Sequence, residues 1–109
     1  MGKKLIPDEI RKKVTEVIDS FNQEELNSSS CNFIARFKGK FLYLDRYVYG
    51  KATPICRLKY QGDFDDWDFA IFKWSSESYD SEDFFFDGSQ YVDGTIEGAM
   101  KAGMYAYPV

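Results

Sequence analysis

Hydrophobic residues recur every three or four positions near the start of the chain. The recurring apolar positions are Ile6, Ile10, Val14, Val17, Ile18 and Phe21. Charged residues lie between them, so the spacing predicts an amphipathic helix with one buried stripe. Pro7, Asp8 and Glu9 fit its first turn, because proline suits the first helical position and carboxylates oppose the positive end of the helix dipole. The polar run at residues 27–30 is predicted to end it.

From residue 31 onward the pattern changes to an alternation that is typical of half-buried strands. Four runs rich in aromatic and β-branched residues are separated by clusters of Gly, Pro and Asp. The predicted strands cover residues 31–38, 41–49, 55–61 and 67–74. The stretch from Gly50 to Pro54 is predicted to turn the chain between the second and third strands. These four runs, with reversals at turn-forming clusters, predict an antiparallel meander.

Alternation assigns the side chains of the second predicted strand to two faces. Leu42, Leu44, Arg46 and Val48 share one face, and Tyr43, Asp45, Tyr47 and Tyr49 share the other. Because successive side chains of a strand point to opposite faces, the first set suits a helix-covered core and the second set suits a wetter surface.

The remaining third of the chain predicts a polar segment and a second helix. Residues 75–83 are polar and acidic, and the three phenylalanines at 84–86 are read either as a short edge strand or as a plug for the core. Asp93 or Thr95 is a candidate cap for a final helix that carries Glu97 in its first turn and ends before Pro108. Its apolar stripe is Ile96, Met100 and Met104.

These elements predict a single α+β domain that covers residues 1–109. It consists of an N-terminal helix, an antiparallel β-meander of four to five strands and a C-terminal helix packed on the sheet, with both helices on one face. The length of 109 residues fits one domain, and a hydrophobic content of 44% supplies enough apolar area for a core. No apolar run approaches the roughly 20 residues that span a bilayer, so we expect a cytoplasmic protein with no membrane partner.

Charge is distributed unevenly along the chain. Residues 1–62 contain twelve Lys and Arg against seven Asp and Glu, whereas residues 63–109 contain two against eleven. Two explanations are open: basic strands and acidic loops neutralise one another in the folded domain, or the basic residues form a dedicated binding face.

The sequence offers little for catalysis. Histidine is absent, and neither Cys31 nor Cys56 lies in a nucleophile motif or at a metal-binding spacing. We expect both to be buried thiols, with a disulfide between them as the minor alternative. Glycine-rich phosphate-binding motifs are absent, and Trp67 stands where an EF-hand would place its third acidic ligand. The sequence therefore favours a protein that is not an enzyme and that has no cofactor and no metal.

The most informative candidates for function are rings and arginines on the predicted sheet. The candidate binding residues are Arg36, Tyr43, Arg46, Tyr47, Tyr49, Arg57 and Trp74. Tyr, Trp and Arg are enriched at protein interfaces, so the first expectation is a small non-catalytic binding domain whose sheet face takes a protein partner or a second copy of itself. The alternative is that the same face binds single-stranded nucleic acid or another anionic ligand, because rings and cations together hold bases and phosphates. The remaining interpretation leaves these rings as core.

Overall fold

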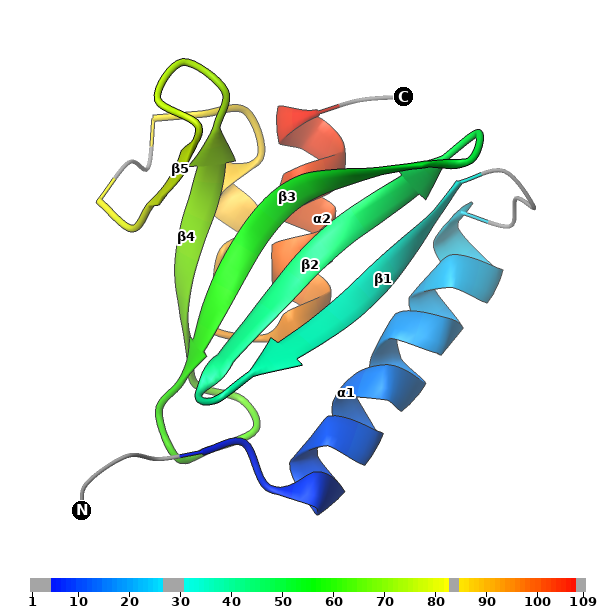
Figure 1. Ribbon diagram of the computed structural model, residues 1–109, viewed down its shortest axis with the longest axis vertical. Helices are drawn as coiled ribbons and strands as arrows, with labels where there is room; N and C mark the ends of the chain where they lie inside the picture. Colours follow the sequence, from blue (N-terminus) through cyan, green and yellow to red (C-terminus); the bar gives the residue numbers. More distant parts are fainter. Residues whose placement is uncertain (1–4, 27–30, 83–84, 108–109) are drawn as a thin grey trace.

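The computed structural model describes residues 5–26, 31–82 and 85–107 and shows the predicted α+β fold (Figure 1). Two helices flank five strands along the chain. The elements are α1 (Asp8–Phe21), η1 (Asn22–Leu26), β1 (Cys31–Lys38), β2 (Phe41–Val48), β3 (Lys51–Tyr60), β4 (Trp67–Lys73), β5 (Ser78–Asp80), η2 (Ser89–Tyr91) and α2 (Ile96–Ala106). The strands form one antiparallel sheet in the order β1-β2-β3-β4-β5, which confirms the predicted meander.

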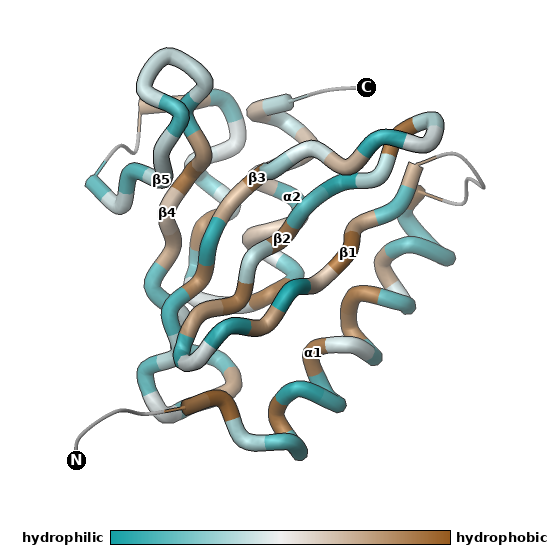
Figure 2. Tube along the Cα trace, in the orientation of Figure 1, coloured by the Kyte–Doolittle hydropathy of each residue, from teal (hydrophilic) through white to brown (hydrophobic). Residues whose placement is uncertain are grey.

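Both helices pack on the same face of this sheet. Figure 1 shows α2 behind β2 and β3 and α1 alongside β1, and the two helices contact each other. The apolar stripe of α1 faces the sheet (Figure 2), and its buried residues are Ile10, Val14, Ile18 and Phe21. Within the described residues, no helix covers the other face of the sheet (Figure 1). We call it the open face.

The core lies between the helices and the inner face of the sheet. Val14, Leu42, Leu44 and Met100 have no exposed surface. The predicted α1 stripe is confirmed, since five of its six residues are buried and Val17 packs against the core. The predicted end of α1 at 27–30 lies outside the described residues; within them, α1 ends at Phe21 and continues into one π-helical turn, η1.

β3 differs from its prediction, because it begins at Lys51 rather than at Ile55. Pro54 was read as part of a turn, yet it pairs with Asp45 on β2. Pro54 has no N–H to donate to a neighbouring strand. No hydrogen bond to β4 is lost, because the pairing of β3 with β4 starts only at Cys56. A bulge follows, with Ile55 unpaired between Pro54 and Cys56. Ile55 is 1% exposed and packs against Gly103 of α2.

The fifth strand lies in a segment that the sequence predicts as a polar loop. β5 pairs with the end of β4, with Tyr79 opposite Phe72. Of the two interpretations of residues 84–86, the structure shows the plug, because the Phe86 ring stacks on Phe69 of the inner face at 5.9 Å; Phe84 lies outside the described residues. Gly88 then touches Ala102 of α2. The described residues after β5 therefore pack on the helix side and leave the open face uncovered.

The exposed edge of β1 is closed at Phe33 by a side chain from η1. The Asn22 Oδ1 accepts a hydrogen bond from the Phe33 backbone N–H at 2.8 Å, and Asn22 Nδ2 donates one to the Phe33 carbonyl at 3.1 Å. The amide thus provides the donor and the acceptor that a neighbouring strand would provide. Edge strands that are closed in this way are poor templates for aggregation.

We expect Asn22→Asp to lower the free energy of unfolding by about 1–3 kcal/mol at neutral pH, because a carboxylate keeps the acceptor but turns a second oxygen toward the Phe33 carbonyl. The difference from wild type should shrink as the pH falls toward about 4, because the disfavoured carboxylate has a raised pKa in the folded protein and can donate once it is protonated. Urea unfolding measures both. The control is Gln23→Glu, which makes the same change at an exposed neighbour. An equal loss in both variants would show that charge near the helix end, and not the bond to Phe33, is responsible.

Candidate binding surface on the open sheet face

The register of the sheet places two predicted arginines and a tyrosine in one row on the open face. Arg36 on β1 lies opposite Tyr43 on β2, and Tyr43 lies opposite Arg57 on β3. The row forms because these positions alternate with Ala35, Leu44 and Leu58, which point to the core on the inner face. Three of the candidate residues are therefore direct neighbours.

A buried carboxylate holds one end of this row. Asp45 accepts two hydrogen bonds from the Arg36 guanidinium, at 2.6 Å from Nε and 3.1 Å from Nη2. The Asp45 side chain is 11% exposed and that of Arg36 is 55% exposed. The bond to Asp45 raises the pKa of Arg36 above its ordinary value, against the opposing effect of burial. A two-pronged bond of this kind fixes the guanidinium plane.

Both guanidinium groups lie on aromatic rings. Arg36 Cζ is 4.9 Å from the centre of the Tyr43 ring, and Arg57 Cζ is 4.7 Å from the Phe41 ring and 5.5 Å from the Tyr79 ring. Tyr43 and Tyr79 meet edge to face at 5.4 Å. Cation–π contacts and edge-to-face rings are each worth about 0.5–1.5 kcal/mol. We call Arg36, Phe41, Tyr43, Asp45, Arg57 and Tyr79 the arginine-ring cluster. It is a rigid centre for the open face.

The pKa of Tyr79 is raised above its ordinary value, first because burial disfavours the phenolate and second because the Asp45 charge lies nearby. We expect Asp45→Asn to lower the pKa of Tyr79 toward that of a free tyrosine, since the Asp45 charge, which raises it, is removed while burial remains. An NMR titration of the Tyr79 ring carbon reports it. The control is Asp68→Asn, an exposed carboxylate on the same face. If both variants, or neither, shift the pKa, Asp45 does not act on Tyr79 as the structure indicates.

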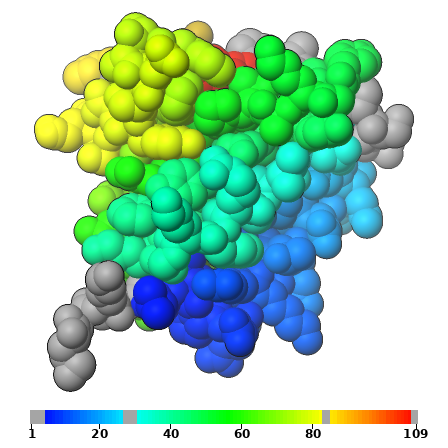
Figure 3. Space-filling model, viewed as in Figure 1, coloured from blue at the N-terminus to red at the C-terminus, as the bar shows by residue number. Residues whose placement is uncertain are grey.

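Exposed apolar side chains lie on the same face as the cluster. Ile34 is 39% exposed, Tyr47 is 42% exposed and Trp74 is 52% exposed. Ile34 lies opposite Asp45 in the β1–β2 pairing, and Trp74 packs its ring edge to face on Phe72 at 5.0 Å. Figure 3 shows this side of the molecule, with the cyan and green atoms of β1 to β3 in the middle and neither helix in front of them. The face therefore combines a polar cluster held by several contacts with exposed apolar side chains beside it.

The structure places the seven predicted residues in three locations. Arg36, Tyr43, Arg57, Tyr47 and Trp74 lie on the open face. Tyr49 is not in β2 as predicted but in the turn after it, with a φ of 49° and 85% exposure. Arg46 is not on the open face at all. It is 5% exposed and lies on the inner face opposite Phe33, as the alternation with Leu44 requires.

Sequence reasoning missed Phe41, Tyr79 and the exposed side chain of Ile34. Ile34 alternates with Arg36, so its face was predictable, and only its residue type suggested a buried position. Tyr79 gave no local signal, since its strand is three residues long and its neighbours are polar.

The described residues contain little else for chemistry. Within residues 5–26, 31–82 and 85–107, no three Cys, Asp or Glu side chains form a group that could hold a metal ion. Cys31 and Cys56 are buried free thiols, separated by β2 and by several residues along the strands, so they are too far apart to bridge. Burial raises the pKa of Cys56 far above its ordinary value, which leaves the thiol protonated. No described helix is long and apolar enough to cross a membrane.

Comparisons with protein-family models, with curated proteins and with solved structures found no match to this chain.

Proposed function

We propose that this protein is a small, non-catalytic interaction domain whose open sheet face binds a protein surface, in the simplest case a second copy of the same chain. The observation that carries the proposal is that the exposed side chains of Ile34, Tyr47 and Trp74 share one sheet face with the arginine-ring cluster. Interfaces commonly place aromatic and arginine anchors inside a surround that excludes water. A cytoplasmic location, expected from the sequence, belongs to the same proposal.

The open face is large enough for such a contact. With eight residues, β2 is about 26 Å long, and the five strands span about 19 Å from the first to the last. The projected area is roughly 500 Å², and the accessible area of a corrugated surface is larger, which approaches the roughly 800 Å² that each partner contributes to a standard interface. A face-to-face pair would bury the same residues on both copies.

The cluster fits a protein partner better than stacked bases. Guanidinium groups already lie on the rings of Phe41, Tyr43 and Tyr79, so these ring faces are occupied. Arg36 is paired with Asp45, and Lys59 lies opposite Asp68 in the β3–β4 pairing, which reduces the positive charge that the face offers to phosphates. Nucleic acid is therefore the second candidate for this face. Its salt-dependent binding would distinguish it from a protein partner.

Sedimentation velocity of the purified chain over a range of concentrations tests the proposal. We expect a monomer–dimer equilibrium with a Kd between about 1 and 100 µM, typical of an interface at the small end of the range. The Kd should change little between low and moderate salt, because the contact is largely apolar. A chain that stays monomeric up to about 1 mM would exclude the second copy as the partner.

A labelled single-stranded oligonucleotide tests the second candidate in the same buffers. Phosphate contacts would give binding that weakens steeply as salt rises. Such binding, together with a monomeric protein, would replace the interface proposal with the nucleic-acid one. Absence of oligonucleotide binding at low salt would remove the second candidate.

A further inference from the structure

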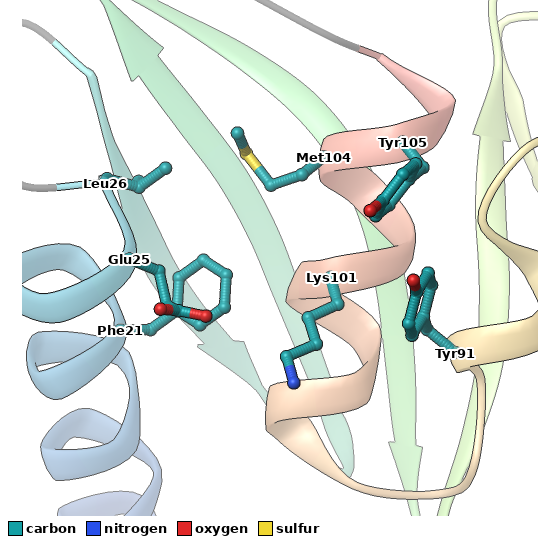
Figure 4. A pocket seen from close by; sticks show the side chains of 7 residues that line it. All are labelled: Phe21, Glu25, Leu26, Tyr91, Lys101, Met104 and Tyr105. Carbon is teal, nitrogen blue, oxygen red and sulfur yellow. The ribbon is translucent and has the colours of Figure 1, made fainter.

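A separate feature lies on the helix side of the sheet, away from the open face. A pocket of about 340 Å³ opens between the end of α1 and α2 (Figure 4). Phe21 and Leu26 line it from one side, and Lys101 and Met104 line it from α2. Its size and its mixture of apolar walls with a few polar groups are typical of small-molecule sites.

A buried cation lies one side chain away from this pocket. Arg46 Nη1 is 3.7 Å from the sulfur of Met104, which is itself a lining residue. Arg46 is 5% exposed, and its Nε is buried without a hydrogen-bond partner. Within the described parts of the chain, Arg46 forms no ion pair; the acidic side chain nearest in sequence, Asp45, is paired with Arg36 on the other face.

The Nε–H of Arg46 is therefore unsatisfied, and within the described chain its Nη1 has only the Met104 sulfur. Burial lowers the pKa of Arg46, since the charged form is deprived of water. A buried guanidinium is ordinarily paired with a carboxylate, because an unpaired charge in the interior is strongly unfavourable. A thioether sulfur is only a weak acceptor. The position beside Met104 therefore lacks the anion that would complete it.

We propose that this pocket binds a small carboxylic acid with an apolar body. The carboxylate displaces the Met104 sulfur and pairs with Arg46, while the apolar part rests on Phe21 and Leu26. Met104 suits this exchange, because an unbranched thioether side chain changes rotamer readily and adapts to new neighbours. No bond is made or broken in the ligand, so the step is a binding step only.

One ammonium and two carboxylates lie at the pocket mouth, whereas the Arg46 guanidinium at its inner end has no carboxylate partner among the described residues. Lys101 extends from α2 along its own helix and is 3.7 Å from Glu97, while Glu25 lies on the facing side near α1 (Figure 4). These groups are partly or fully exposed, so water and salt screen them. Arg46 is screened much less. A ligand should therefore enter with its apolar body outermost and its carboxylate toward the sheet.

Titration with phenylbutyrate, followed by NMR of the Met104 methyl group and the Arg46 Nε–H, tests the proposal. The control ligand is phenylbutyramide, which has the same shape without the charge. We expect saturable shifts of both signals with a Kd at or below about 1 mM for the acid. The amide should bind at least about tenfold more weakly, because charge-assisted bonds are the stronger ones.

Two matched variants test whether the Arg46 charge binds the ligand carboxylate. Arg46→Met should abolish the response to phenylbutyrate, whereas Arg11→Met should keep it, since Arg11 also has a buried Nε without a partner but lies on Phe37, away from the pocket. Equal binding of acid and amide, no saturable shift in the wild-type protein, or full binding by Arg46→Met would each overturn the proposal. If Arg46→Met does not fold, the difference in affinity between phenylbutyrate and phenylbutyramide for the wild-type protein decides the proposal. The open face takes no part in these experiments, so their outcome is independent of the interface.

Discussion

Gly88→Ala should lower the free energy of unfolding by about 3 kcal/mol or more. Gly88 is buried at a φ of 100°, and a Cβ there would lie 2.6 Å from the Ala102 carbonyl oxygen and 2.8 Å from Tyr105 Cβ. This carbonyl belongs to the backbone of α2, so it cannot move away without distorting the helix. Left-handed backbone strain contributes about 1–2 kcal/mol, and overpacking contributes about 1–3 kcal/mol. Urea unfolding monitored by circular dichroism measures the loss.

Gly50→Ala is the matched control for this substitution. Gly50 has a similar φ of 83°, but the one atom near its would-be Cβ is the Tyr47 hydroxyl at 3.9 Å. Gly50→Ala should therefore lose only the strain contribution of about 1–2 kcal/mol. The comparison matters for function, because Gly88 docks the segment after β5 on α2 and so keeps it off the open face. Equal losses in the two variants would mean that this segment does not pack on α2.

Trp74→Ser should weaken the proposed dimer by about 30-fold or more. Trp74 is 52% exposed and lies on Phe72 at the margin of the open face, so its burial in a dimer would remove a large apolar surface from water. Losing the burial of a half-exposed tryptophan ring removes roughly 100 Å² of apolar contact, which is worth about 2 kcal/mol or more and corresponds to this factor. Sedimentation velocity at several concentrations gives the dissociation constants of the variant and the wild-type protein.

Tyr105→Ser is the control for Trp74→Ser. Tyr105 is an aromatic residue of nearly equal exposure, 53%, but it lies on α2 on the helix side of the sheet. Its loss should leave the dimer constant within about twofold, because it lies outside the proposed interface. Circular dichroism checks that both variants are folded. Equal weakening by the two substitutions would place the interface elsewhere, and no weakening by Trp74→Ser would remove Trp74 from it.

The sequence predicts the fold well where short-range patterns decide the structure. β1 matches its predicted range at both ends, because alternation begins at Cys31 and Gly39 permits the reversal. α1 follows from its apolar period and its first turn. β3 and β5 depend on distant partners instead. Pro54 is tolerated only because β4 does not reach it, and Tyr79 is held by the rings of Phe72 and Tyr43.

The candidate site was predicted in part for the same reason. Alternation places Arg36, Tyr43 and Arg57 on one face, but cross-strand register is needed to show that they form one row. Arg46 shows the limit of residue type as a guide. Its charge suggested a surface position, whereas its place between Leu44 and Val48 on β2 puts it in the interior. The closure of β1 by Asn22 gave no signal in the sequence, since it joins residues from different elements.

Proton–nitrogen correlation spectra recorded as the protein concentration rises test the central claim most directly, because they report association and its location together. The account predicts concentration-dependent shifts that cluster on the open face, at Ile34, Arg36, Tyr47, Arg57 and Trp74, with the backbone signals of α1 and α2 unchanged. Spectra that do not change with concentration, or shifts confined to the two helices, would contradict it.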